Sequence, residues 1–128
     1  MLPNCEGFTM ALAQPSAFGS GGVPDLRVDI HPGVPLVIEV CGEIDVESAP
    51  WLRDELLRTV RRHGPRIALD LGGVTFLDCA GINVLLSTRR RALLEGGCLR
   101  VVRPSARAWR TISLLGLQDV LTTGTPSA

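Results

Sequence analysis

The sequence predicts an α/β domain with a mixed, mainly parallel sheet of four to five strands and three to four helices. Strand-like apolar segments alternate with amphipathic helical segments in the order β-β-α-β-α-β-α. Residues 67–71 (Ile-Ala-Leu-Asp-Leu) form a near-continuous apolar run, which is typical of a strand covered on both faces. A helix that joins two strands of one sheet places them parallel in a right-handed crossover. These observations favour helices packed against a central sheet.

Size and composition fit one domain and argue against several classes of protein. The chain has 128 residues, is 45% hydrophobic, and has a formal net charge of zero. Because nucleic-acid binding depends on an excess of positive charge, we expect no direct nucleic-acid partner. No apolar run approaches the roughly 20 residues of a membrane span, so we expect no membrane association.

The cysteines do not form a metal-binding or redox motif. Cys5, Cys41, Cys79 and Cys98 are scattered along the chain without a C-x-x-C pair. With only two histidines in the chain, they do not match a zinc site, and we expect no metal or cofactor. Prolines and glycines interrupt the N-terminal segment, which does not resemble a signal peptide. We therefore expect reduced thiols in a cytoplasmic protein.

The first half of the chain divides into a leader and a hairpin. Residues 1–24 lack sustained periodicity and are rich in proline and glycine, which predicts a disordered leader. Residues 26–30 alternate apolar and polar side chains, residues 36–41 are β-branched and apolar, and a proline-containing turn separates them. This pattern predicts an antiparallel hairpin. We place one domain at residues 25–123 and expect residues 124–128 to fray.

Three helices follow, each with a candidate N-cap. Ser48, Asp78 and Ser105 precede segments of helical period, and their side-chain oxygens are suited to accept the free N–H groups of a first turn. Gly72-Gly73 follows the apolar run and predicts that its strand ends in a turn before Asp78. A further strand is predicted at residues 98–102, before the last helix.

The sequence does not assemble a catalytic set. His31 and His63 fall in a turn and at a helix end, and neither lies beside an obvious nucleophile. Gly72-Gly73 precedes a helix but lacks the G-x-G-x-x-G and G-K-[ST] patterns of phosphate-binding loops. We expect that this protein is not an enzyme.

Residues 69–86 (Leu-Asp-Leu-Gly-Gly-Val-Thr-Phe-Leu-Asp-Cys-Ala-Gly-Ile-Asn-Val-Leu-Leu) resemble the signature of STAS domains, the anti-sigma factor antagonists of bacteria. Residues 42–45 (Gly-Glu-Ile-Asp), followed by residues 48–50, are similar to the family's Gly-Glu-Leu-Asp element, and residues 109–120 resemble its last helix and tail. The resemblance covers roughly residues 25–123. It implies a STAS-like fold and a domain that binds an anti-sigma factor of histidine-kinase-like ATPase fold, which releases a sigma factor.

The chain departs from the family pattern at the position of the family's switch. The resemblance implies that the kinase-like partner phosphorylates a Ser or Thr in an Asp-Ser-Ser/Thr-Gly motif, but this chain has Asp78-Cys79-Ala80-Gly81. Ala80 has no hydroxyl group, so a phosphate, with its charge of about −2, is not expected there. One hypothesis is a permanently binding-competent antagonist. A second is a redox switch at Cys79, against the simpler interpretation that Cys79 is a small replacement for serine.

The resemblance implies a partner-binding surface at this helix tip, along the polar face of the helix, and on the loop at residues 42–45. One alternative is that this helix face is merely solvated. Another is a module that senses a small ligand or nucleotide at the helix tip and Asp45. A weak homodimer is also compatible with the sequence. The predicted partner-binding residues are Glu43, Asp45, Asp78, Cys79, Ala80, Gly81, Asn83, Ser87, Arg90 and Arg91.

Overall fold

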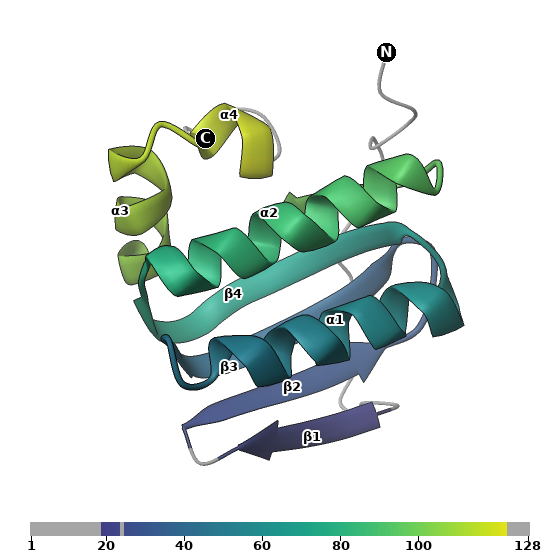
Figure 1. Cartoon of the computed structure of the whole chain (residues 1–128), viewed down its shortest axis with the longest axis horizontal. Coiled ribbons are helices and arrows are strands. Elements are labelled where there is room, and N and C mark those ends of the chain that lie inside the picture. The colour runs from purple at the N-terminus through teal and green to yellow at the C-terminus, as the bar shows by residue number, and fades with distance from the viewer. Residues whose placement is uncertain (1–18, 24, 123–128) are drawn as a thin grey trace.

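The computed structural model describes residues 19–23 and 25–122, which form one five-stranded sheet and four helices (Figure 1). The strands are β1 (Gly19–Val23), β2 (Leu26–His31), β3 (Leu36–Ile44), β4 (Arg66–Leu77) and β5 (Cys98–Val101). The helices are α1 (Ala49–His63), α2 (Cys79–Leu94), α3 (Ala106–Leu114) and α4 (Gln118–Leu121). The chain thus forms the α/β domain that the alternating pattern predicts.

The order of the strands in the sheet follows their order in the sequence, β1-β2-β3-β4-β5. β2 runs antiparallel to both β1 and β3, whereas β3, β4 and β5 run parallel to one another. Helices α1 and α2 are the crossovers between the parallel strands, as a parallel connection requires. The prediction of a hairpin followed by parallel strands in a mixed sheet is therefore confirmed.

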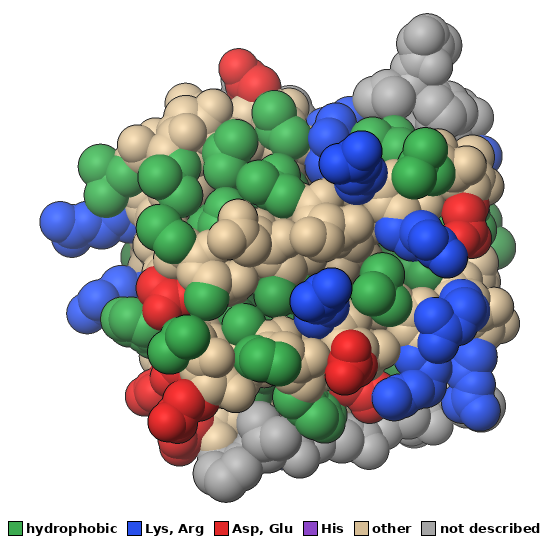
Figure 2. Space-filling model, viewed as in Figure 1, with side chains coloured by type: hydrophobic (Ala, Val, Ile, Leu, Met, Phe, Trp, Pro, Cys, Tyr) green, Lys and Arg blue, Asp and Glu red, His purple; other side chains and the backbone are tan. Residues whose placement is uncertain are grey.

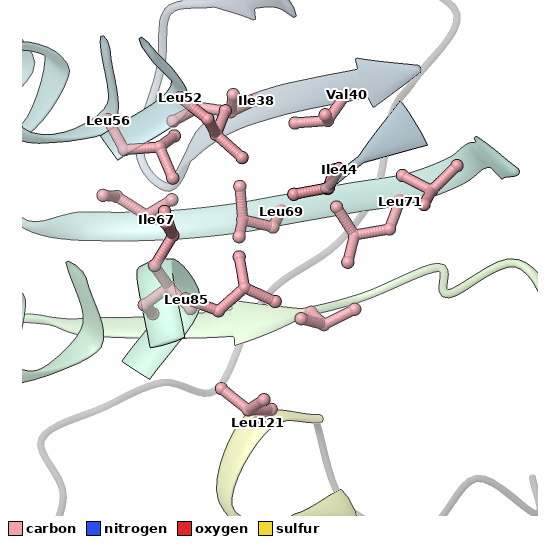
Figure 3. Close-up of a cluster of buried hydrophobic side chains, with 14 of the residues drawn as sticks. Ile38, Val40, Ile44, Leu52, Leu56, Ile67, Leu69, Leu71, Leu85 and Leu121 are labelled. Carbon is pink, nitrogen blue, oxygen red and sulfur yellow. The ribbon is translucent and has the colours of Figure 1, made fainter. Parts of the chain in front are cut away.

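The core lies between the sheet and two helices. α1 and α2 lie side by side across one face of the sheet (Figure 1). Figure 3 shows aliphatic side chains of β3 and β4 directed toward those of α1 and α2. Ile38 and Leu69 on the strands, and Leu52 and Leu85 on the helices, are fully buried. Full burial of such a side chain contributes about 1.5–3 kcal/mol, so this layer holds both helices in place.

β4 is longer than the sequence predicts. It continues through Gly72-Gly73 to Leu77, and the expected turn at the two glycines is wrong. A Cβ atom at Gly73 would lie 2.6 Å from Sγ of Cys41 on β3, so glycine here permits close approach of two strands. The register between β3 and β4 also shifts after Glu39, which leaves extra residues on β4 as a β-bulge.

The sheet also begins earlier than the sequence predicts. Residues 19–23, expected as the end of a disordered leader, form β1 and pair with β2. The segment Gly-Ser-Gly-Gly-Val has no apolar alternation, so its pairing through backbone hydrogen bonds leaves no periodic signal in the sequence. The remaining predictions for the ends of the chain concern residues 1–18 and 123–128, which lie outside the described residues.

The last helices close the sheet at the β5 edge. Ser105 caps α3 as predicted, because its Oγ accepts the backbone N–H of Ala108 at 3.0 Å. Residues 118–121 form the short helix α4, which is followed by a parallel bridge between Thr122 and Val101. Leu121 of α4 is fully buried and belongs to the core cluster (Figure 3).

Cysteine pairing differs from the prediction of four reduced thiols. Cys98, buried at the start of β5, is disulfide-bonded. Cys41 and Cys79 are free thiols, the first half-buried and the second exposed. A disulfide requires Cα atoms about 4.4–6.8 Å apart. Such proximity is not visible in the spacing of cysteines along a sequence.

Candidate functional site

The tip of α2 is fixed by Asp78 at the end of β4. The Oδ1 atom of Asp78 accepts the backbone N–H groups of Ala80 at 2.9 Å and Gly81 at 3.1 Å. The backbone N–H of Asp78 donates to the carbonyl of Ile44 at 3.3 Å, which ties the tip to the end of β3. The prediction that Asp78 is the N-cap is confirmed, and its carboxylate is already used within the helix terminus.

The three residues after Asp78 differ in their exposure. Cys79 is exposed and Ala80 is half-buried against the core. Gly81 is buried, and a Cβ atom there would lie 2.6 Å from Cγ2 of Ile44. Gly81 therefore allows α2 to approach the end of β3, and it presents no side chain to a partner.

The loop between β3 and α1 is closed by Asp45 and Ser48. Oδ1 of Asp45 accepts the backbone N–H groups of Glu47 and Ser48, both at 3.0 Å, and lies 3.2 Å from Oγ of Ser48. Oγ of Ser48 accepts the N–H of Asp45 at 3.0 Å and donates to the carbonyl of Glu43 at 2.9 Å. The hydrogen bond from the Ser48 N–H lowers the pKa of the Asp45 carboxyl below its ordinary value of 3.8.

These bonds change the roles predicted for both residues. Ser48 precedes α1 as expected, but its side chain makes no capping hydrogen bond because its hydroxyl is used within the loop. The Asp45 carboxylate is directed inward to the loop backbone instead of outward to solvent. The side chain of Val46 between them is left 71% exposed. Together, Asp45 and Ser48 hold the loop in a shape that presents Val46.

A groove of about 260 Å³ runs between the N-terminal halves of α1 and α2. Figure 2 shows hydrophobic side chains around this end of the two helices. Asn83 and Ser87 supply polar groups from α2, and Arg53 supplies a cation from α1. The residues that line the groove are Val46, Ala49, Pro50, Arg53, Ala80, Asn83, Val84 and Ser87.

Charged side chains divide between the two ends of α1. Glu43 and Glu47 are exposed just before its N-terminus, whereas Arg61 and Arg62 lie in its last turn. Figure 2 shows acidic side chains gathered at the lower left and most of the arginines at the right, with others projecting at the left edge. This distribution complements the helix dipole, which is positive at the N-terminus. The groove lies at the end of the helix layer where Glu43 and Glu47 are exposed, but its own wall carries the cation of Arg53 and no carboxylate.

A match to a protein-family model identifies the family to which this fold belongs. Residues 25–127 match the family model of the STAS domain. The chain belongs to the STAS domain family. The expected signature at residues 69–86 falls within the match, and so do the loop before α1 and the helix tip.

Relatives of this STAS domain are named as antagonists of anti-sigma factors. The anti-sigma-B factor antagonist of Bacillus subtilis (strain 168) is 32% identical over 84 residues, which cover 66% of this chain and 76% of the relative. An anti-sigma factor antagonist from Mycobacterium paratuberculosis, known as a crystal structure, is 28% identical with a TM-score of 0.68, over 80% of this chain and 88% of that chain. SpoIIAA in its unphosphorylated form shares the fold, with a TM-score of 0.60 at 19% identity over 78% of this chain and 90% of that chain.

The STAS fold brings the loop and the helix tip together. Ile44 pairs with Leu77 where β3 and β4 end side by side, so Glu43 and Asp45 lie next to the tip that begins at Asp78. Asn83 and Ser87 follow on the exposed face of α2 and line the groove.

Arg90 and Arg91 are not brought to this end of the STAS domain. They lie in the last turns of α2, roughly 16–18 Å along the helix from Cys79 at 1.5 Å per residue. Arg91 is also occupied, because its Nε donates to Oε2 of Glu95 at 2.8 Å. The structure therefore separates these two arginines from the groove.

The α1 side of the groove was not predicted from the sequence. Val46, Pro50 and Arg53 line it together with the predicted residues of α2. The one available signal was Val46, an apolar residue between Asp45 and Glu47 in a polar turn. The contribution of Pro50 and Arg53 depends on how α1 packs beside α2, which no local pattern specifies.

The described part of the STAS domain carries neither a metal-binding cluster nor a membrane-spanning helix. Within residues 19–23 and 25–122, no group of three or more His, Cys, Asp or Glu side chains is arranged to hold a metal ion. Over the same residues, no helix has both the length and the apolar character needed to cross a membrane.

Proposed function

We propose that this protein is an anti-sigma factor antagonist, which binds an anti-sigma factor through the N-terminal ends of α1 and α2 and thereby releases a sigma factor. The observation that carries the proposal is the meeting of the family's loop at residues 42–45 and its helix tip at residues 78–81 beside one groove. The names of the relatives, including one at 32% identity, support the same function.

The partner that we propose is an anti-sigma factor of histidine-kinase-like ATPase fold, and the place of action is the cytoplasm. The role is binding without catalysis. In support, the groove residues include no cysteine, histidine or carboxylate, so the groove lacks a base to activate a nucleophile. Asn83 and Ser87 instead supply hydrogen-bonding groups of the kind that orient a protein partner.

The second part of the proposal is that this antagonist is permanently competent to bind. Ala80 takes the place of a phosphoacceptor in the motif Asp78-Cys79-Ala80-Gly81, and a methyl group cannot accept a phosphoryl group. SpoIIAA is known in both unphosphorylated and phosphorylated forms, so a relative of the same fold does carry the modification. In this protein the charge at the helix tip would not change, and the extent of binding to the partner would be controlled by the amount of the protein.

The open shape of the groove supports a protein partner over a small ligand. Pockets for small molecules and cofactors usually have volumes of about 300–1,000 Å³ and enclose most of the ligand. The groove, at about 260 Å³, is near the lower end of that range, but it is open on the outer face of two helices and encloses little. It is suited to a side chain of another protein better than to a nucleotide.

Binding of the purified chain to an anti-sigma factor encoded in the same genome, with and without ATP, tests both parts. We expect binding that ATP does not reverse, and no phosphate on residues 78–88 by mass spectrometry. Ala80→Ser is the comparator: phosphorylation of that variant followed by release of the partner would show that only the acceptor is missing. Absence of binding by the wild-type chain would overturn the proposed function.

A charge at the helix tip gives a second test with a matched control. Ala80→Glu places a carboxylate on the wall of the groove. We expect affinity for the partner to fall at least about tenfold, because a charge that is buried at an interface without an opposite charge beside it is costly. Ala106→Glu places the same side chain at the first turn of α3, where it is exposed. Equal losses in the two variants would contradict the proposed location of the interface.

A further inference from the structure

The exposed side chain of Val46 differs from the other exposed apolar residues of the described chain. Single exposed apolar side chains are normal on protein surfaces and need no explanation. Val46, however, is 71% exposed at the tip of a loop that is closed on both sides by Asp45 and Ser48. It also forms part of the wall of the groove. A held apolar side chain beside a hollow is suited to contact because little conformational entropy is lost on binding.

The lining of the groove indicates the chemistry of its occupant. Most of it is apolar, with Val46 and Pro50 on the α1 side and Ala80 and Val84 on the α2 side. Such a lining favours one apolar side chain, inserted as the anchor of a larger interface.

Arg53 indicates what lies beside that anchor. Its side chain lines the groove and is exposed, and no ion pair of Arg53 is found among the described residues. The nearby Glu55 is already paired with Arg58 at 2.8 Å. A guanidinium group at the rim of an apolar groove binds a carboxylate with good geometry, so charge complementarity favours an acidic residue on the partner.

We propose that the groove receives an apolar side chain of the anti-sigma factor, with a neighbouring carboxylate of the same partner bound by Arg53. Asp45 and Ser48 act as positioning residues that hold Val46 against the inserted side chain. This inference rests on the proposed function, and it names the part of the partner that the site selects. Contact with the partner is thus assigned to Val46 and Arg53, and not to the carboxylate of Asp45 that the sequence predicts.

Isothermal titration of the full chain against the anti-sigma factor encoded in the same genome tests the proposal. We expect Val46→Ala to weaken binding about tenfold. Val34→Ala is the matched control, because Val34 is also a highly exposed valine, 85% exposed, in the turn at the opposite end of β3. We expect Val34→Ala to change affinity by less than about twofold, as for a surface substitution outside the interface.

Charge reversal on α1 tests the proposed contact between Arg53 and a carboxylate of the partner. We expect Arg53→Glu to weaken binding about tenfold, and Arg61→Glu, an exposed position eight residues later on the same helix, to leave it within about twofold. Asp45→Ala tests positioning. It should weaken binding in the wild-type background and have little further effect in Val46→Ala, because both changes remove the same contact.

The outcomes separate this inference from the proposed function. If the wild-type chain binds and neither Val46→Ala nor Arg53→Glu weakens binding beyond its control, the groove inference is wrong and the antagonist function stands. If the wild-type chain does not bind, both fail. If sedimentation shows that the chain alone self-associates and that Val46→Ala abolishes this association, the occupant is a second copy and the inference is overturned. Thermal unfolding of each variant identifies any loss of binding that is due to loss of the fold.

Discussion

Gly81 of α2 lies directly against Ile44 at the end of β3. A Cβ atom at position 81 would stand 2.6 Å from Cγ2 of Ile44, and 2.5 Å from Cδ1 of Leu77. Real Cβ atoms do not approach so closely, so the glycine sets the distance between the helix tip and the two strand ends. The tip and the loop after Ile44 share one surface because of this contact.

Replacing Gly81 tests that contact. We expect Gly81→Ala to lower the free energy of unfolding by ~1–2 kcal/mol, because overpacking costs about 1–3 kcal/mol and alanine's helix propensity returns at most about 1 kcal/mol. Urea denaturation measures the change. Asn83→Ala, exposed two residues later on the same helix, should shift stability by less than about 0.5 kcal/mol. A Gly81→Ala chain as stable as wild type would show that Ile44 and Leu77 yield without cost.

The cap at Asp78 gives a second prediction. Asp78→Ala removes the acceptor for the N–H groups of Ala80 and Gly81, and we expect a loss of about 0.5–2 kcal/mol. Asp78→Asn should keep most of that stability, since an asparagine oxygen caps about as well. Chemical denaturation of the three proteins at one pH checks the order. Equal losses in both variants would indicate that the charge of Asp78, and not its geometry, stabilises α2.

Asp45 predicts a dependence of stability on pH. Because the hydrogen bond from Ser48 lowers the pKa of Asp45 below its ordinary value of 3.8, the folded state favours the ionised form. That stabilisation is present above the ordinary value and is lost as the pH falls through the lowered pKa. We expect Asp45→Asn to lose less stability than wild type between pH 6 and roughly pH 3, measured by urea midpoints.

Asp54→Asn is the control for this pH dependence. Asp54 is exposed on α1, and no hydrogen bond or ion pair of its side chain is found among the described residues. If Asp54→Asn flattens the pH profile as much as Asp45→Asn does, the bonds of the loop are not the source of the effect.

The two free thiols of residues 25–122 should react at different rates. Burial, together with the charge of Glu39, raises the pKa of the Cys41 thiol, while Cys79 is exposed at the start of α2. Because the thiolate is the reactive form, we expect iodoacetamide at pH 7.5 to label Cys79 well before Cys41. Peptide mass spectrometry follows both sites, and in Cys79→Ser the peptide of Cys41 should still be labelled at its slow rate.

The same labelling tests the redox hypothesis for Cys79. A redox switch requires a thiol that reacts faster in the folded protein than in the unfolded chain. If Cys79 is labelled no faster under native conditions than in urea, the thiol is exposed without being activated, and the interpretation as a replacement for serine is favoured.

Much of the fold could be predicted because its signals are local. The period of apolar residues marks a strand or a helix, and the caps at Asp78 and Ser105 are chemistry between neighbours in the chain. The limits of elements were predicted less well. Gly72-Gly73 indicated a turn by composition, but a neighbouring strand keeps that backbone extended as part of β4.

The candidate site was predicted in part for the same reason. The helix tip and the loop at residues 42–45 follow from residue patterns, and the register of β3 with β4 then places them together. The roles of the individual side chains in the site could not be predicted from the sequence. Whether Asp45 faces solvent or its own loop depends on how the backbone folds around Ser48, and both arrangements use the same residues.

The α/β order, the hairpin, the caps at Asp78 and Ser105 and the missing hydroxyl group at Ala80 can be read from the residues alone, because each depends on neighbouring residues or on one residue's chemistry. Three other features come from the packing of the folded chain: Cys98 forms a disulfide, Gly81 lets α2 lie close against Ile44, and Val46 and Arg53 share a groove with Ala80. These are distances between residues far apart in the chain. Packing of the helix layer on the sheet sets them, and no local pattern records them.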